Sequence, residues 1–486
     1  MKKLLLAVID GARPAMLEQA ASDGHAPALA ALLERGSYEP RAVSAFPSVT
    51  PVCAATIATG LGPDRHLVPS MNWYDRAQAR YVEYGSSFRA SLRFGLGRQL
   101  TDLVYNMNGE HLASDALTIF ERLDDAGLRT ACTTYLIFRG RHSHQPAQDS
   151  ALTRIAALSL IRRPVMGPGE LFYADIFSSR DTGCRSTLGL PGVRDRHAGC
   201  VGEYLVANDL FDFLLLSLPD NDNHSHKQGP DAQVAAIAQA DRAIARVFDA
   251  AGGAEQFLAS HAVIVVADHA HTLVERSVSL ARALGSFDVR RPTDMRALEA
   301  SQIAVCPAQR AAMIYVFGGA EMLERVLARA RALDGVDHVI WREDGQACVA
   351  RGPLELRFEP GDEAADLRGR SWRLHGDLDA LGLTLLHGVV SSDEFPDALG
   401  RVWDATGCAT AGEVLLTAAE GVEFSDWGGA DHVGGGSHGS LSAGDSYAPL
   451  IRCGLDGQQQ RTHPEGHGQW SIADVAPLIT AHFGVS

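Results

Sequence analysis

No apolar run in the 486-residue sequence approaches the length of a membrane span. The N-terminal run covers only residues 4–9 before Asp10 interrupts it. A spanning helix needs about 20 apolar residues, and a secretory signal needs about 7–15 followed by a small-residue cleavage site. We therefore expect no membrane span and no signal peptide, and we interpret residues 4–9 as a buried first strand.

Cysteines are also few: there are eight, spread from Cys53 to Cys453, with no C-x-x-C pair. A disulfide framework is typical of short secreted chains and not of a chain this long. We expect reduced and mostly buried thiols, and hence a cytoplasmic location.

Basic residues are also fewer than acidic ones: the net charge is -16 and the pI is about 5.6. A nucleic-acid polymer is excluded as a partner because little basic surface is available to neutralise its phosphates. A small phosphorylated substrate remains possible if bound metal ions supply the positive charge locally. The sequence does not indicate an oligomeric state.

The hydrophobic residues form short continuous runs, at 4–9, 213–218 and 262–267, with a weaker one at 130–138. Continuous runs are typical of parallel strands covered on both faces. Helical patterns at 27–35 and 231–250 fall between them. This alternation predicts an α/β fold with a doubly wound, mostly parallel sheet flanked by helices.

Two segments interrupt the alternation. Residues 71–112 are polar and aromatic and are expected to pass over one rim of the sheet. Residues 281–400 contain a strand–helix–strand pattern followed by polar strands, which predicts a smaller α+β cap. The catalytic core is then expected to comprise residues 1–280 and 401–486.

Acids and histidines follow three of the predicted strands. Asp10 comes directly after residues 4–9, Asp222 and His226 follow residues 213–218, and Asp268-His269 follows residues 262–267. Each taken alone is compatible with a turn or a helix cap. Because ligands bind at the carboxyl edge of such sheets, the coincidence predicts a metal site assembled from distant parts of the chain.

A nucleophile is predicted at Thr50, which precedes Pro51 and a run of small residues. Proline suits the first turn of a helix, so Thr50 is expected at the N-cap, where free N–H groups and the helix dipole stabilise an anion. A plain capping threonine is the alternative interpretation. Ser48 is the alternative nucleophile.

Five motifs together resemble the alkaline phosphatase superfamily, and most of all its type I phosphodiesterase/nucleotide pyrophosphatase branch. They are Asp10-Gly11, Thr50 opening T-P-V-C-A-A-T-I-A-T-G, Asp222-x-x-x-His226-x-x-Gly229-Pro230, Asp268-His269 and Ser437-His438-Gly439. The motifs span the core from residue 10 to residue 438 and leave the two interrupting segments unmatched.

The resemblance implies two divalent metal ions about 4 Å apart. They would be zinc, with manganese or iron as alternatives. One ion would be held by Asp222, His226 and His438, and the other by Asp10, Thr50, Asp268 and His269. His438 is assigned from the resemblance alone. Asp220 and His224 have the spacing of Asp222 and His226, but only the later pair places Gly229-Pro230 at the family offset. His224, His271 and His432 are close enough in sequence to support the ligands.

The implied reaction is phosphodiester hydrolysis through a phosphothreonine at Thr50. Asn72 would bind a phosphoryl oxygen. Tyr74 would line a leaving-group pocket, with packing in the core or in a lid as the alternative. Met71 occupies the position where the branch has this asparagine, and Cys53 departs from its T-F-P-N pattern. A phosphomonoesterase, a phosphonate hydrolase and a catalytically silent binding protein on the same fold therefore stay open as alternatives.

Overall fold

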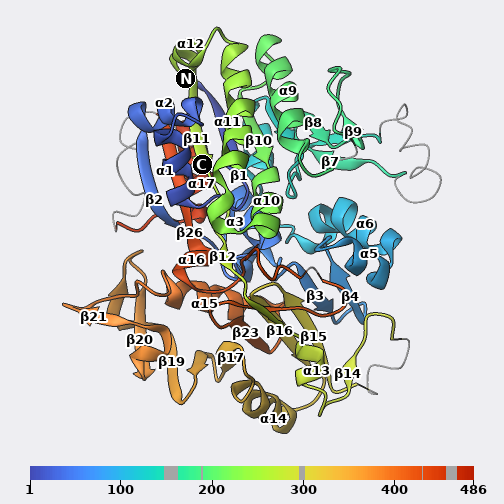
Figure 1. Cartoon of the computed structure of the whole chain (residues 1–486), viewed down its shortest axis with the longest axis vertical. Coiled ribbons are helices and arrows are strands. Elements are labelled where there is room, and N and C mark those ends of the chain that lie inside the picture. The colour runs from blue at the N-terminus through green and yellow to red at the C-terminus, as the bar shows by residue number, and fades with distance from the viewer. Residues whose placement is uncertain (147–161, 188–189, 295–300, 430, 456–467, 486) are drawn as a thin grey trace.

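The computed structural model describes residues 1–146, 162–187, 190–294, 301–429, 431–455 and 468–485. Two large sheets form the two halves of the molecule (Figure 1). The eight-stranded sheet has the order β2 (Ser37–Val43), β26 (Tyr447–Cys453), β11 (His261–Val266), β1 (Lys3–Ile9), β10 (Phe213–Leu218), β5 (Thr130–Thr133), β8 (Glu170–Tyr173) and β9 (Phe177–Ser178).

The centre of this sheet is parallel, as the sequence predicts. Strand β1 pairs in parallel with both β10 and β11, and β5 links β10 to β8 in the same sense. Strands β2 and β26 at one side of the sheet and β9 at the other are antiparallel to their neighbours. All residues of β10 and β11 are buried, which explains why these strands are apolar without alternation.

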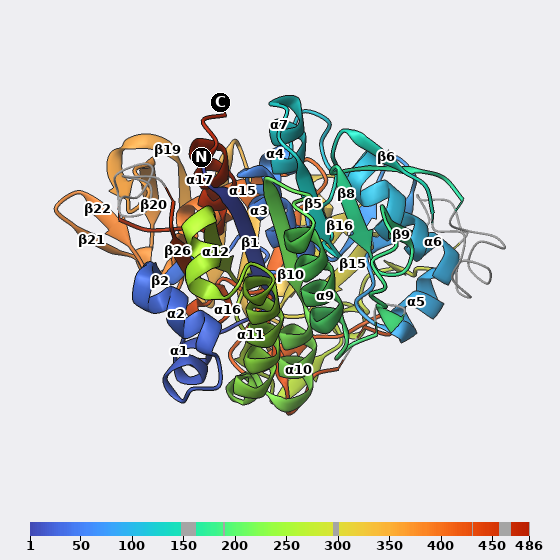
Figure 2. The same ribbon diagram turned by 90° about the horizontal axis from the view of Figure 1, so that it is seen from above.

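Helices cover both faces of the sheet (Figure 2). Helices α1 (Pro14–Ser22), α9 (Arg194–Ala207) and α11 (Val234–Asp249) pack on one side, with α2 (Pro27–Arg35) against α11. Helices α3 (Thr50–Thr59), α7 (Ile119–Asp125) and α17 (Val475–His482) pack on the other. The predicted doubly wound α/β fold is confirmed. In α3 every residue after Thr50 is buried, so its small side chains allow close packing.

The second sheet has ten strands. Its order is β14 (Val289–Arg290), β15 (Ile303–Ala308), β16 (Ala311–Val316), β23 (Val414–Ala418), β17 (Val336–Glu343), β18 (Gln346–Arg351), β19 (Leu354–Asp366), β22 (Val389–Ser391) and β21 (Thr384–Leu386), with β20 (Ser371–Gly376) pairing β19. Helix α14 (Ala320–Arg331) lies between β16 and β17 in the chain, and helix α15 (Ala398–Gly407) lies between β22 and β23. Strand β23 comes from beyond residue 400, so this sheet draws on both sides of the predicted boundary.

The aromatic segment 71–112 forms a hairpin and three short helical elements. These are β3 (Asn72–Asp75), β4 (Arg80–Glu83), α5 (Phe88–Phe94), α6 (Leu96–Thr101) and the π-helical η1 (Asp102–His111). A bidentate ion pair between Arg80 and Asp102 ties the hairpin to η1. The ring of Tyr74 packs against Tyr81 and Tyr315, so the hairpin is joined to the second sheet.

The prediction of reduced thiols is wrong for one pair of cysteines. Cys184 and Cys200 form a disulfide, with Cα atoms 5.9 Å apart. The other six cysteines are free and buried, as predicted. The pair could not be foreseen because its two cysteines are brought together by the packing of α9. The cytoplasmic location stays a prediction. Within the described ranges, no helix combines the length and the apolar character that crossing a membrane requires.

We predict that the protein loses stability as the pH falls below about 6.5, the ordinary pKa of histidine. Burial lowers the pKa of His66 to about 3 and the pKa values of His111, His261 and His338 to about 4. The unfolded chain therefore takes up protons that the folded chain does not, so the free energy of unfolding decreases with falling pH.

The substitution His66→Gln removes one of the buried imidazoles that take up a proton on unfolding. The free energy of unfolding, measured with denaturant between about pH 6 and pH 4, should change less steeply with pH in this variant than in the wild type. The difference in this pH slope should be up to about 1.4 kcal/mol per pH unit. The same substitution at the exposed His25 is the control. An unchanged slope in His66→Gln would contradict the assignment of a neutral buried imidazole.

Candidate active site

The predicted ligand residues gather at the carboxyl edge of the first sheet. Strands β1, β10 and β11 end at the same level, since Ile9 pairs with Leu218 and Val8 pairs with Val266. Asp10 directly follows β1, and Asp268 and His269 lie just beyond β11. Strand β10 leads into helix α10 (Asp220–Gln228), which carries Asp222 and His226 one turn apart.

His438 reaches the same edge through a short antiparallel pairing. Strand β12 (Thr272–Leu273) follows the Asp268-His269 motif and pairs with β25 (Gly436–Ser437), with Thr272 opposite Ser437. His438 is therefore placed beside His271 although the two are far apart in sequence. The Arg310 N–H, which comes from the second sheet, donates to the His438 carbonyl over 2.8 Å and fixes this loop.

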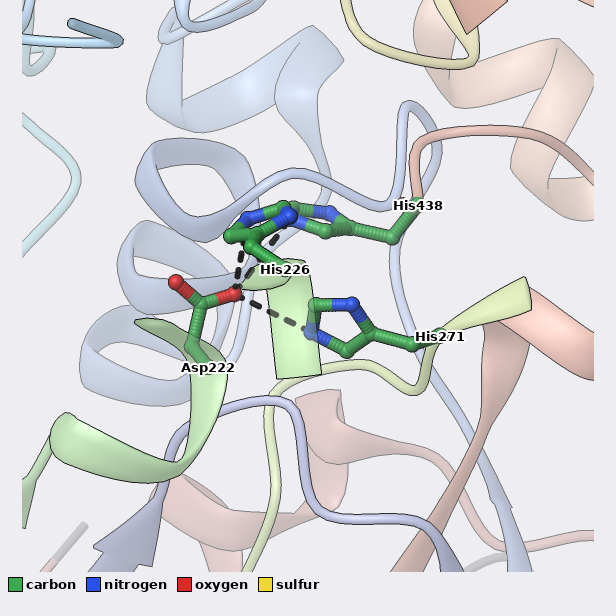
Figure 3. A group of neighbouring side chains, drawn as sticks. All are labelled: Asp222, His226, His271 and His438. Carbon is green, nitrogen blue, oxygen red and sulfur yellow. Dashed lines mark hydrogen bonds and ion pairs between the residues drawn. The ribbon is translucent and has the colours of Figure 1, made fainter. Parts of the chain in front are cut away.

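One cluster is formed by Asp222, His226, His271 and His438 (Figure 3). The Oδ1 atom of Asp222 lies 3.2 Å from the Nε2 of His226, 3.1 Å from that of His271 and 3.6 Å from that of His438. Three imidazole nitrogens thus surround a single carboxylate oxygen.

Two of these imidazoles are oriented by backbone carbonyls. The Nδ1 of His226 lies 2.7 Å from the Gly436 carbonyl oxygen, and the Nδ1 of His438 lies 2.7 Å from that of Ser48. A carbonyl can only accept, so each Nδ1 carries the hydrogen and each Nε2 directs a lone pair at Asp222. Lone pairs facing a carboxylate oxygen require a cation between them, either a proton or a metal ion.

The pKa shifts in this cluster agree with a cation between the Asp222 carboxylate and the imidazoles. Burial opposes charge on both partners, but the Asp222 carboxylate raises the pKa of His226, and the imidazoles of His226 and His271 lower the pKa of Asp222. Burial, together with the neighbouring histidines, lowers the pKa of His438 well below its usual value. The Nε2 of His438 therefore keeps its lone pair, and it has no hydrogen-bond partner among the described residues.

A second cluster is formed by Asp10, Thr50, Asp268 and His269. The Nε2 of His269 lies 3.2 Å from Thr50 Oγ1, 3.6 Å from Asp10 Oδ1 and 3.5 Å from Asp268 Oδ2. Its ring stacks on that of His438 with the centroids 3.6 Å apart, so the two clusters are adjacent. Burial raises the pKa of Asp10 well above its usual value, and repulsion from Asp268 and Asp222 adds to this effect.

The helix that carries Thr50 begins one position earlier than predicted. Val49 takes the N-cap position, because its carbonyl accepts from the N–H of Cys53, and Thr50 is the first helical residue. The Thr50 hydroxyl has no capping role and points at His269. Ser48 is fully buried, donates to the Ser440 carbonyl and accepts from the Gly439 N–H, so its hydroxyl is engaged in holding a loop.

The two clusters together fit a pair of divalent metal ions. Carboxylates and neutral imidazoles are the ligands that zinc, manganese and iron accept. Buried acceptors without a partner in the described part of the chain, such as Asp10 Oδ1, are satisfied by such ions. All seven predicted ligands take part in these two clusters. The first cluster also contains His271, to which the sequence assigns only a supporting role.

The remaining sequence candidates fall into different places. The His432 ring stacks on that of His226 at 4.0 Å, and its Nδ1 contacts Glu423, so it supports the first cluster. The Nε2 of His224 lies 2.9 Å from the Ala232 carbonyl oxygen and has no part in either cluster. Asn72 lines a small pocket together with His432. Tyr74 does not line that pocket and lies in the aromatic cluster described above.

Sequence reasoning missed the buried ion pair between Arg310 and Asp445. The Arg310 guanidinium donates to Asp445 over 2.9 Å, and the same carboxylate accepts from the Ser440 N–H and the Thr272 hydroxyl. The pair thus ties the loop after His438 to strand β12. No motif surrounds either residue, so burial in the folded chain is the only signal that reveals them.

Comparison with known proteins agrees with this fold. The family model for type I phosphodiesterase/nucleotide pyrophosphatase matches residues 4–338. The murine ectonucleotide pyrophosphatase/phosphodiesterase 5 structure superposes with a TM-score of 0.59 at 13% identity, covering 100% of this chain and 96% of that one. Phosphonoacetate hydrolase from Sinorhizobium meliloti 1021 gives 0.55 at 18% identity, covering 99% and 96%. No curated protein matches the chain in a sequence search.

The fold and the clustered acids and histidines define a phosphoester hydrolase of the alkaline phosphatase superfamily. Within it, the chain belongs to the type I phosphodiesterase/nucleotide pyrophosphatase family.

A substitution at Gly11 tests whether the first cluster requires the close approach of the backbone to His271. It has a φ of +64°, and a Cβ there would lie 2.4 Å from the Nε2 of His271. Gly24 has a φ of +76° and no atom within 4 Å of its Cβ position. Gly24→Ala should therefore lower the free energy of unfolding only by the backbone strain, about 1–2 kcal/mol. Gly11→Ala should lower it further and should also release metal during dialysis. Equal behaviour of the two variants in unfolding and metal content would contradict the packing described here.

Proposed function

We propose that this protein is a two-metal phosphodiesterase that uses Thr50 as its nucleophile. The observation that carries the proposal is the convergence of Thr50 Oγ1 and the carboxylates of Asp10 and Asp268 on the Nε2 of His269. A hydroxyl held among metal-ligand groups at the start of a buried helix is positioned for attack on phosphorus. The Asp222 cluster lies beside it and provides a second cation site.

Metal ions bound in the two clusters would neutralise phosphoryl oxygens and favour the ionised form of the Thr50 hydroxyl. The Thr50 hydroxyl gives up its proton to water, and Oγ1 attacks phosphorus in line. The ester oxygen opposite leaves and takes up a proton, and a phosphothreonine forms that still carries the second ester group. Water then attacks this phosphothreonine, which frees the threonine and releases a phosphomonoester. The three carboxylates of the site repel this product, which carries more negative charge than the diester. Asn72 is assigned to hold a phosphoryl oxygen, which its place beside His432 supports.

A small phosphorylated molecule is the proposed substrate. The murine ectonucleotide pyrophosphatase/phosphodiesterase 5 has also been solved as an inactive variant in complex with AMP, which supports a nucleotide-sized ligand. The second candidate activity is phosphonate hydrolysis, which the likeness to phosphonoacetate hydrolase supports. Zinc is the proposed metal in either case, with manganese or iron as alternatives.

Thr50→Ala separates the nucleophile from the metal ligands. The variant should lose turnover by several orders of magnitude, while it keeps nearly the full metal content of the wild type because three other side chains hold the second site. Thr50→Ser should retain measurable activity, since it keeps a hydroxyl. Metal analysis and single-turnover assays on both variants provide the measurements. Full activity of Thr50→Ala would remove Thr50 from the mechanism.

The substrate class is tested by parallel rate measurements. Bis-p-nitrophenyl phosphate should be hydrolysed with a higher kcat/KM than p-nitrophenyl phosphate, and Asn72→Ala should lower kcat/KM on the diester. A large preference for the monoester would refute the diesterase assignment, and turnover of phosphonoacetate alone would favour the phosphonate hydrolase. A purified protein that binds no metal and hydrolyses none of these compounds would indicate a catalytically silent binding protein.

A further inference from the structure

A buried glutamine, Gln233, lies between the two segments that carry the first metal-ligand residues of each cluster. Its side chain is fully buried, and its Nε2 donates to the Gly11 carbonyl over 2.9 Å and to the Ser225 hydroxyl over 3.1 Å. Its Oε1 accepts from the Arg13 N–H over 2.9 Å. Both amide hydrogens and the amide oxygen are therefore engaged, and every partner lies within three residues of a predicted metal ligand.

On one side, Gln233 holds the loop that follows strand β1. The Gly11 carbonyl accepts from Gln233, while the Gly11 N–H donates to Asp268 Oδ1 over 3.0 Å. Asp10 directly precedes Gly11 in the chain. Gly11 therefore connects Gln233 to both acids of the second cluster, to Asp10 through the main chain and to Asp268 through a hydrogen bond.

On the other side, Gln233 holds helix α10 at Ser225, which directly precedes His226 and lies one turn after Asp222. A Cβ on Gly436 would lie 2.9 Å from Ser225 Oγ, so strand β25 also packs closely at this point. The Gly436 carbonyl is the partner of His226 Nδ1. A shift of Ser225 would therefore move His226 and the carbonyl that orients its ring.

We propose that Gln233 is a positioning residue for both metal sites, because its side-chain amide fixes the Asp10 loop against the helix that carries Asp222 and His226. The inference rests on the metal sites of the proposed function and deepens it. Gln233 touches neither cluster directly, and it acts through the main chain at Gly11 and Arg13 and through the Ser225 hydroxyl.

Ordinary packing does not explain an amide at this position. Gln233 occupies the N-cap position of helix α11, yet its side chain makes no capping hydrogen bond to that helix. Burial of an amide costs free energy unless its polar atoms are paired, and an apolar side chain of similar length would fill the same space without that cost. The three partners of the amide, and not the volume that it fills, therefore account for the glutamine.

Gln233→Met is the informative variant, since methionine is neutral and of similar length but makes none of the three hydrogen bonds. Asp241→Asn is its matched control. Asp241 is also buried, on helix α11, and its carboxylate accepts from the N–H groups of Ala28 and Leu29 at the start of α2. Among the described residues it makes no hydrogen bond to either ligand segment, so its substitution should lower stability without moving the metal ligands.

The experiment uses the full chain loaded with Zn²⁺ and needs no substrate. Chelator competition, well below the unfolding temperature, measures how tightly the two ions are held. Loss of a group that orients metal ligands weakens metal binding about 10–100-fold, and we expect a loss in this range for both ions in Gln233→Met. Asp241→Asn should keep the wild-type affinities although its free energy of unfolding is lower.

Ser225→Ala is the second variant, because it keeps the glutamine and removes only its link to α10. It should weaken metal retention less than Gln233→Met does. In the double variant the two effects should not add, since both substitutions remove the same contact. Fully additive effects would contradict a shared contact, and Ser225→Ala decides alone if Gln233→Met does not fold.

The outcomes separate this inference from the proposed function. A wild-type protein that retains no Zn²⁺ would refute both. A wild-type protein that holds two ions, together with Gln233→Met and Ser225→Ala variants of unchanged affinity, would refute only the role of Gln233. An equal loss of affinity in Asp241→Asn would assign the effect to general stability and would refute that role as well.

Discussion

Repulsion among buried acids is the constraint on which the rest of this structure depends. Asp10, Asp222 and Asp268 meet at one sheet edge, and the raised pKa of Asp10 reflects burial together with the charges of the other two. Imidazoles whose hydrogens are committed to backbone carbonyls add further lone pairs. Protons or metal ions between these groups relieve the repulsion, so the site is suited to hold positive charge at its centre.

The scaffold around the site keeps these groups from moving apart. The helix that begins at Thr50 is buried along almost its whole length, and strands β1, β10 and β11 are fixed by their parallel pairing. The second sheet adds the buried Arg310–Asp445 ion pair, which connects the loop after His438 to the strand after His271. The second sheet therefore contributes to the scaffold of the candidate metal site.

Much of the core could be predicted because it is encoded locally. Strand β10 matches the apolar run at residues 213–218, and α2 has the predicted ends. The thiol prediction failed where distant segments meet, because the disulfide between Cys184 and Cys200 depends on packing that no local pattern identifies. The place of β23 inside the second sheet and the packing of Tyr74 against Tyr81 and Tyr315 depend on distant partners in the same way.

The sequence by itself determined the chemistry at the strand ends, because an acid or histidine that follows a continuous apolar run must lie at the carboxyl edge of a parallel sheet. It therefore identified Asp10, Asp222, His226, Asp268 and His269 as candidates. Only the tertiary structure decided how His438 and His271 join them. The pairing of β12 with β25 sets the two histidines side by side, and a two-residue antiparallel bridge between remote segments leaves no periodic signal in the chain.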